Sequence, residues 1–121
     1  MKSICVFGVF VADLCFISEK IPEVGQTVLG TKHLIGPGGK GSNQAIAAAR
    51  LGGNISFITK IGDDNNAEMA LNLYKSSGVN TDYIIKDKNQ STGVAGIMIN
   101  ANTGAVSYTH LRAHETAQYL V

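Results

Sequence analysis

Gly36-Pro37-Gly38-Gly39-Lys40-Gly41-Ser42-Asn43-Gln44-Ala45 is the stretch that decides the fold of this chain, and an alanine-rich helical pattern continues from it to Leu51. Glycines let other groups approach the backbone closely. A helix N-terminus offers unpaired N–H donors and a partial positive charge. Lys40 adds a cation, and Asn43 adds an amide that both donates and accepts. We expect a corner that takes a small, hydroxyl-rich or anionic ligand, or else a turn that only packs a helix on a sheet.

Two nucleotide-binding motifs match this stretch poorly. Gly36, Gly38 and Gly41 fit the dinucleotide spacing G-x-G-x-x-G. The preceding segment 30–35 is polar, however, and no acidic residue ends a strand about 20 residues further on, as that motif requires. A phosphate loop needs Ser or Thr directly after its lysine, and Lys40 is followed by glycine. The dinucleotide interpretation is therefore weak, and the phosphate loop fails.

Composition limits the class of protein. The chain has 121 residues, 45% of them hydrophobic and 16% charged, with a net charge of +1. This indicates one folded domain and, without a basic run, neither nucleic acid nor a membrane surface as partner. The apolar run 4–11 lacks a signal-peptide cleavage pattern. Cys5 and Cys15 lie in or beside apolar runs, so we expect buried, reduced thiols and a cytoplasmic location.

Hydrophobic periodicity predicts an α/β layer. Strands buried on both faces are expected at 4–11 and 54–61, a short strand at 83–85, helices at 40–51 and 65–77, exposed strands at 16–21, 27–35 and 92–100, and a hairpin turn at 102–104. Strand–helix–strand–helix–strand order implies a parallel sheet. The more polar segments at about 16–35 and 92–106 would form a separate flap. Asp63, Asp64 and Asn65 are helix-capping residue types, and Asn65 with Glu68 forms a capping box.

The glycine run also resembles a known family. Residues 38–45, with Gly52 and Gly62, resemble the first signature of the PfkB-type carbohydrate kinases, and the wording Gly-Gly-Lys-Gly-x-Asn-Gln-Ala resembles the ribokinase branch. Four further segments have counterparts in that family: Ala12-Asp13, 25–28, 61–64 and 91–95. The resemblance covers roughly residues 3–106, about the first third of a ribokinase-like chain.

The resemblance implies a fold and an activity. The fold is a ribokinase-like three-layer α/β sandwich with a β-lid over the sugar site, and this chain is its N-terminal part, residues 1–106. The activity is ATP-dependent phosphorylation of a pentose or related sugar at a primary hydroxyl. The resemblance implies ATP and Mg in the parent enzyme, leaves a monovalent cation open as a third cofactor, and implies none on this chain alone. Lid strands often pair between subunits, so the parent is expected to be a homodimer.

The resemblance implies sugar contacts from Asp13, Gly39, Lys40 and Asn43. Asp13 would lie just past the C-terminal end of the first strand, where open α/β sheets place ligands. Its carboxylate accepts two or more hydroxyl groups, which suits a sugar. The alternatives are a loop-capping role for Asp13 and a helix-capping role for Asn43. Ribokinases usually have Asn two residues before this Asp, whereas this chain has Val11.

The remaining sequence departs from the family. The family's Gly-Ala-Gly-Asp motif, whose Asp takes the proton from the sugar hydroxyl, does not occur in the 121 residues. Phosphoryl transfer depends on a positioned base and electrostatic stabilisation, so we do not expect this chain alone to be a kinase. Residues 107–121 form a foreign-looking tail that resembles translated sequencing-adapter read-through, and we expect it to be arbitrarily placed. His110 and His114 have helical metal-ligand spacing as the alternative, and His33 is expected to be a surface residue.

Three other functions remain open. The first is a PfkB-type kinase for another sugar or a nucleoside, which Val11 leaves open. The second is a non-catalytic short protein that binds a sugar or dimerises through its lid. The third is a dinucleotide-binding module, which rests only on the glycine spacing.

Overall fold

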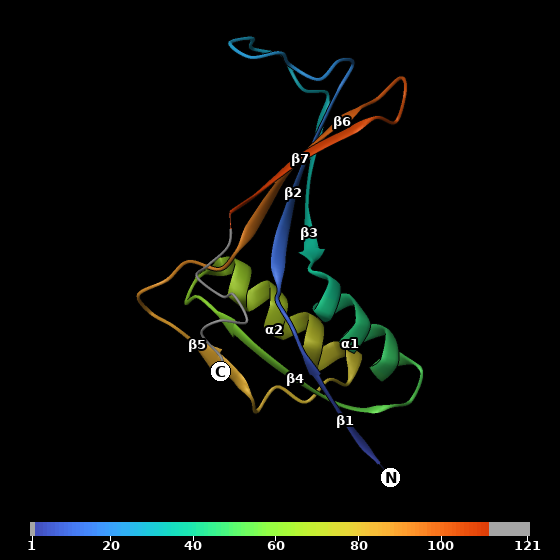
Figure 1. Ribbon diagram of the computed structural model, residues 1–121, viewed down its shortest axis with the longest axis vertical. Helices are drawn as coiled ribbons and strands as arrows, with labels where there is room; N and C mark the ends of the chain where they lie inside the picture. The colour runs from blue at the N-terminus through green and yellow to red at the C-terminus, as the bar shows by residue number, and fades with distance from the viewer. Residues whose placement is uncertain (1, 112–121) are drawn as a thin grey trace.

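An α/β layer forms the base of the molecule in the computed structural model, which describes residues 2–111. Strands β1 (Ser3–Phe7), β4 (Asn54–Ile61) and β5 (Ile84–Lys86) form a parallel sheet in the order β1-β4-β5. Helices α1 (Lys40–Arg50) and α2 (Asn65–Ser77) cover these strands, and α2 connects β4 to β5 (Figure 1). The predicted parallel α/β layer is confirmed.

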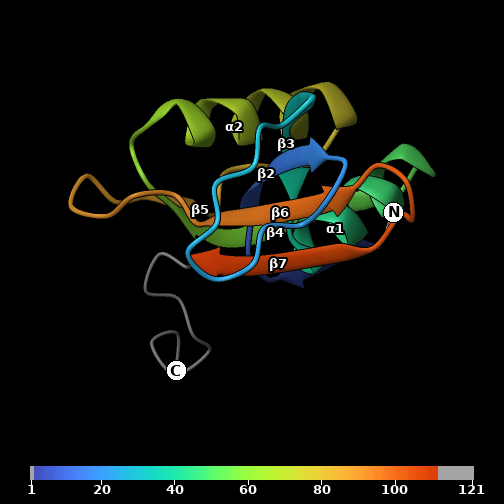
Figure 2. The same cartoon turned by 90° about the horizontal axis from the view of Figure 1, so that it is seen from above.

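A second sheet rises from this layer, and we call it the lid sheet. It consists of β2 (Val11–Ser18), β3 (Lys32–Gly38), β6 (Val94–Asn100) and β7 (Val106–Leu111) in the order β3-β2-β6-β7. β2 runs parallel to β6, and the other two pairs are antiparallel. Figure 1 shows the lid sheet standing away from the helices, and Figure 2 looks down on it from above. The predicted separate flap is confirmed, although its first strand begins earlier than expected.

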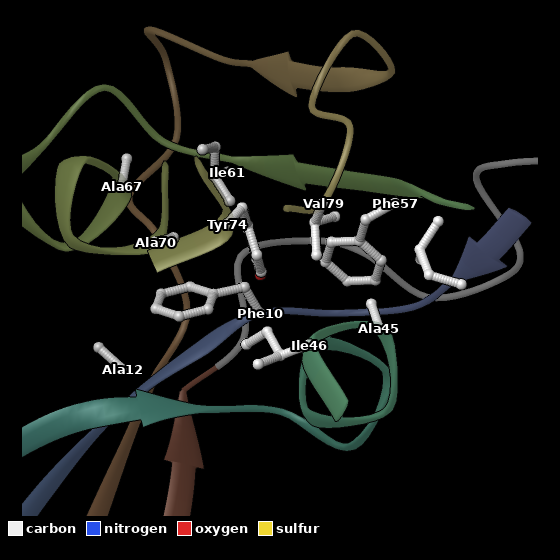
Figure 3. Packing of buried hydrophobic residues seen from close by; sticks show 11 residues of the cluster. Phe10, Ala12, Ala45, Ile46, Phe57, Ile61, Ala67, Ala70, Tyr74 and Val79 are labelled. Atoms are coloured by element: carbon white, nitrogen blue, oxygen red, sulfur yellow. The ribbon is translucent and has the colours of Figure 1, made fainter. Parts of the chain in front are cut away.

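The hydrophobic core lies between β4 and the two helices. Its centre is Tyr74 of α2, whose ring makes edge contacts with Phe10 and Phe57 at centroid distances of 6.3 and 5.2 Å (Figure 3). Most of the other buried residues come from β4 and both helices: Ala45, Ile46, Ile55, Ile61, Ala67 and Ala70. Ala12 of β2 and Val79, which follows α2, complete the core. Small alanines on both helices let the helices and the sheet approach closely.

The predicted strand 4–11, buried on both faces, is wrong in two respects. β1 ends at Phe7, and the chain then passes through residues 8–10 into the lid sheet. Ile4 and Phe7 are 53% and 51% exposed. β1 is an edge strand, and the core places both helices of the described chain on one face of the sheet. Phe7 pairs with Ile58, which alternates with the core residue Phe57, so it lies on the opposite face.

Cys5 and Cys15 are both free, but the predicted burial is wrong for them. Cys5 is exposed and Cys15 is half-buried. Cys5 lies on the uncovered edge strand β1, and Cys15 lies on β2 in the thin lid sheet. An apolar strand pattern therefore did not imply burial at either thiol.

The ends of α2 follow local signals. Asp64 is the N-cap, and its Oδ1 accepts a hydrogen bond of 2.9 Å from the Ala67 N–H. The capping box expected from Asn65 is wrong, because Asp64 occupies the cap position and Asn65 is the first helical residue. The helix ends at Gly78, whose φ of 78° is in the left-handed region that favours glycine.

Residues 107–111, which the sequence patterns set apart from the family, lie in β7. The predicted turn at 102–104 joins β6 to β7, and the two strands pair in an antiparallel register. The remainder of the tail, with His114 of the hypothetical metal pair, lies outside the described residues. The foreign origin of residues 107–121 stays a prediction. Within residues 2–111, neither helix is long and apolar enough to cross a membrane.

Candidate functional site

The glycine run packs against the connection between β1 and β2, backbone against backbone. Gly39 is the N-cap of α1 with φ of 96°, and a Cβ placed on it would meet the carbonyl of Val9. A Cβ on Gly41 would lie 2.8 Å from Cα of Gly8. Real Cβ atoms do not come so close, so glycine is required at both positions. The start of α1 is thereby pressed against residues 8–10.

The dinucleotide interpretation of Gly36, Gly38 and Gly41 does not fit this geometry. That motif follows a strand of a parallel βαβ unit. Here α1 follows β3, which lies in the lid sheet and pairs antiparallel with β2.

Asp13 lies beside the start of α1. It is the third residue of β2, not a loop residue just past β1, because β1 ends at Phe7. It pairs with Gly36 of β3 and with Ala95 of β6. A Cβ built on Gly38 would lie 2.6 Å from Cγ of Asp13. The half-buried carboxylate therefore lies against Gly38, one residue before the N-cap of α1.

The first turn of α1 carries the other predicted site residues. Lys40 and Asn43 are both exposed. The Asn43 N–H donates to the Gly39 carbonyl at 2.9 Å, so Asn43 is inside the helix and does not cap its N-terminus. In the part of the chain that the structure describes, no side chain caps α1 and no acidic residue lies in its first turn. The structure thus brings Asp13 to Gly39 and the first turn of α1, which carries Lys40 and Asn43.

Tyr74 of α2 contacts the first turn of α1 from the hydrophobic core, and the sequence patterns did not reveal this contact. Its hydroxyl donates a hydrogen bond of 2.9 Å to Oγ of Ser42, and both side chains are buried. Burial raises the pKa of Tyr74 to about 12, although the bond to Ser42 opposes that rise. The only available signal was a tyrosine on the apolar stripe of α2, which is typical of simple core packing.

We expect the free energy of unfolding to fall between about pH 10 and 12. The unfolded chain releases the tyrosine proton near pH 10, whereas the raised pKa of Tyr74 keeps it bound in the folded chain. The unfolded state then binds fewer protons, so the loss reaches about 3 kcal/mol. Urea titrations at pH 8 to 12 measure it. Tyr74→Phe should remove most of this dependence, and an unchanged dependence in that variant would contradict the assignment.

A second polar cluster joins the lid sheet to the α/β layer, and we call it the lid anchor: Gly62, Asp64 and Thr92. Asp64 accepts from the Thr92 N–H at 2.8 Å and from its Oγ1 at 2.7 Å. Thr92 Oγ1 accepts from the Gly62 N–H at 3.0 Å. Burial opposes ionisation of Asp64, but the hydrogen bonds from Thr92 and from the helix N-terminus lower its pKa. These bonds use the Thr92 hydroxyl, which lies in the segment 91–95 that has a counterpart in the family.

The other polar residues singled out from the sequence have surface roles. Asp63 is not a cap, since Lys86 binds it at 3.3 Å and also binds Glu68 at 2.8 Å. His33 is exposed on β3, as expected. Among residues 2–111 no group of three or more His, Cys, Asp or Glu side chains is placed to hold a metal ion.

Comparison with known families shows which family the chain belongs to. The model of the pfkB family carbohydrate kinases matches residues 1–120. This chain belongs to that family. The match extends over residues 107–120, which the sequence patterns assigned to a foreign tail. The foreign origin of that tail stays a prediction.

Curated relatives narrow the family to its ribokinase branch. The chain is 46% identical over 99 residues to a ribokinase of Bacillus subtilis, covering 82% of this chain and 34% of that protein. It is 41% identical over 100 residues to a deoxyribokinase of Salmonella typhi, covering 83% and 33%. The chain therefore spans about a third of the length of these relatives.

Solved structures confirm the ribokinase-like fold. A ribokinase from Cryptococcus neoformans in complex with ADP matches with a TM-score of 0.80 at 34% identity, over 91% of this chain and 35% of that one. An Arabidopsis thaliana ribokinase complexed with ribose and ATP matches with a TM-score of 0.78 at 27% identity, over 90% and 35%. The match covers most of this chain and about a third of each solved chain, so the described residues correspond to a part of that fold.

Proposed function

We propose that this chain is the sugar-binding part of an ATP-dependent kinase that phosphorylates a pentose or related sugar at a primary hydroxyl. One observation carries the proposal: the Asp13 carboxylate lies against Gly38, directly beside the N-terminus of α1. The relatives named ribokinase and deoxyribokinase support the same substrate class.

The chemistry of the corner suits a polyhydroxyl ligand. Asp13 accepts hydrogen bonds from two neighbouring hydroxyls, and Lys40 and Asn43 donate to sugar oxygens. The N-terminal N–H groups of α1 add donors and a partial positive charge that favours oxygen ligands. Gly39 lets the sugar approach the backbone closely. Asp13, Gly39, Lys40 and Asn43 are thus the residues that we propose to bind the sugar.

Phosphoryl transfer would need groups beyond these residues. The family's ATP and Mg supply the phosphoryl group and neutralise its charge. The described residues offer no metal-ligand cluster, and the 121 residues hold no Gly-Ala-Gly-Asp motif. They do not fit a magnesium site, so we derive no step through one. Our proposal for this chain alone is sugar binding without turnover.

The lid sheet is the surface that we propose for homodimerisation. It exposes apolar side chains on one face of two adjacent strands: Phe16 is 45% exposed and Ile35 is 59% exposed, and Ile35 pairs with Leu14, which lies on the same face as Phe16. An exposed apolar sheet of this kind favours burial against another copy. Sedimentation should show a dimer, and charged substitutions at Phe16 and Ile35 should shift it toward monomer.

Val11 is the residue that we propose to relax selectivity among pentoses. It is 5% exposed and pairs with Gly38, which contacts Asp13. Valine cannot bond a sugar hydroxyl, and an unpaired hydroxyl facing it costs about 1–3 kcal/mol. We therefore expect the dissociation constants of D-ribose and 2-deoxy-D-ribose to differ by less than about tenfold. Calorimetric titration of both sugars measures this ratio.

The variant Val11→Asn should raise the preference for D-ribose, and Val11→Ala controls for the loss of packing. A strong preference for ribose in the unchanged chain would contradict the role of Val11. Preferential binding of a nucleoside or a hexose would instead favour the alternative of a PfkB-type kinase that acts on that compound.

A non-catalytic sugar-binding protein is the remaining alternative. An independent read of the source DNA across codons 95–121 and beyond distinguishes it. A frame that continues past Val106 into a Gly-Ala-Gly-Asp segment would support a foreign origin of the tail, and its full product should phosphorylate the sugar. A stop directly after Val121 would favour binding without turnover.

A further inference from the structure

Tyr74 touches both segments that form the candidate site, although it lies on neither. From α2, its hydroxyl reaches Ser42 in the first turn of α1 at 2.9 Å. Its ring makes an edge contact with Phe10, the last residue before β2, at 6.3 Å between centroids. The side chain is fully buried, with Phe57 of β4 against its ring at 5.2 Å between centroids. Figure 3 shows Tyr74 and Phe10 next to each other in the core.

Each of these contacts is next to a site residue. Ser42 directly precedes Asn43 and is two residues after Lys40 in the same helical turn. Phe10 lies three residues before Asp13, and its Cα would be 3.2 Å from a Cβ on Gly39. A shift of Tyr74 would therefore move the first turn of α1 relative to the strand that carries Asp13.

Unlike apolar packing, the hydrogen bond between Tyr74 and Ser42 is directional. Tyr74 is the donor and Ser42 Oγ the acceptor, both side chains are buried, and the rings of Phe10 and Phe57 lie against Tyr74. A buried hydroxyl that loses its partner is costly, so the pair restricts the first turn of α1 to a narrow range of positions.

We propose that Tyr74 is a positioning residue of the sugar site, which through Ser42 and Phe10 sets the spacing between the first turn of α1 and Asp13. That the ligand is a sugar rests on the proposed function, whereas the positioning of the first turn of α1 rests on the contacts of Tyr74 alone. The competing explanation is that Tyr74 only stabilises the core.

Three variants of the 121-residue chain separate the two explanations: Tyr74→Phe, Ser42→Ala and the double variant. Each keeps the ring or the helix and removes only the hydrogen bond. Tyr83→Phe, at a tyrosine that is 55% exposed, and Ser76→Ala, at an exposed serine of α2, are the matched controls. Two quantities are measured well below the melting temperature: the dissociation constant of D-ribose and the exchange rate of the Asn43 amide.

We expect each single variant to weaken D-ribose binding about fivefold. The double variant should weaken it no further, because the two hydroxyls act as one unit. Exchange of the Asn43 amide, which reports opening of the first turn, should be faster in all three. The controls should leave both quantities unchanged.

Variants that lose thermal stability but keep the ribose affinity and the Asn43 exchange rate of the unchanged chain would overturn the proposal. A multiplied loss of affinity in the double variant would also overturn it, since the two groups would then act separately. If the unchanged chain binds no ribose, the proposed function fails. The exchange rate then decides on Tyr74: faster Asn43 exchange in Tyr74→Phe supports positioning of the turn, and an unchanged rate rejects it.

Discussion

Replacing Gly39 with alanine should lower the free energy of unfolding by about 2–6 kcal/mol, the largest effect that we expect from one methyl group. Gly39 has φ of 96°, a conformation that strains other residues, and its new Cβ would meet the Val9 carbonyl. Strain and clash each cost about 1–3 kcal/mol. A small domain has only about 5–15 kcal/mol in total, so much of the chain would unfold. Urea denaturation followed by circular dichroism measures the change.

Gly25→Ala is the matched control for this substitution. Gly25 also has a positive φ, 82°, but a Cβ added to it would have no atom within 4 Å. Only the conformational strain of about 1 kcal/mol should then appear. Equal losses in the two variants would show that the contact with Val9 has no energetic weight, and would contradict the packing of α1 against residues 8–10.

Asp64→Ala should lower the free energy of unfolding by about 2–4 kcal/mol. The substitution removes the N-cap of α2 and both hydrogen bonds to Thr92. A lost cap costs about 1 kcal/mol. The two hydrogen bonds come from the same residue, Thr92, and are not additive, so together they count as one hydrogen bond to a charged group, about 1.5–3 kcal/mol. Chemical denaturation measures the loss. The Thr92 amide should also exchange faster, because the lid anchor fixes the start of β6.

Asp63→Ala provides the contrast. Asp63 is an exposed neighbour whose partner, Lys86, also binds Glu68, so its loss should cost less than about 1 kcal/mol. The effect of Asp64 should depend on pH. Its pKa is lowered in the folded chain, so its stabilisation is present above the unfolded pKa near 4 and disappears as the pH falls through the folded pKa. Similar losses for the two variants at neutral pH would contradict the lid anchor.

The sequence predicted well those elements whose signals are local. Both helices and β4 appear where periodicity and flanking glycines placed them, because such signals lie within one element. β1 was predicted less well. Its burial depends on which face the helices cover, and its end depends on a contact between Gly8 and Gly41 far along the chain. Local patterns do not record such contacts.

In the candidate site, too, local signals predicted some residues and missed others. Asp13, Lys40 and Asn43 could be proposed from motif and residue chemistry. Their supports could not, since Tyr74 and Ser42 are 32 positions apart and Thr92 and Asp64 are 28 apart. Asp13 itself was placed in a loop, because the apolar run 4–11 reads as one strand although the chain changes sheets within it.

The most direct test of the account is a titration of the 121-residue chain with D-ribose, followed by the amide signals of the first turn of α1. We predict saturable binding that shifts the signals of Gly39, Lys40 and Asn43, and that Asp13→Ala abolishes. Asp82→Ala, at an exposed carboxylate, should bind as the unchanged chain does. Absence of saturable binding, or equal binding by Asp13→Ala, would contradict a sugar site at this corner.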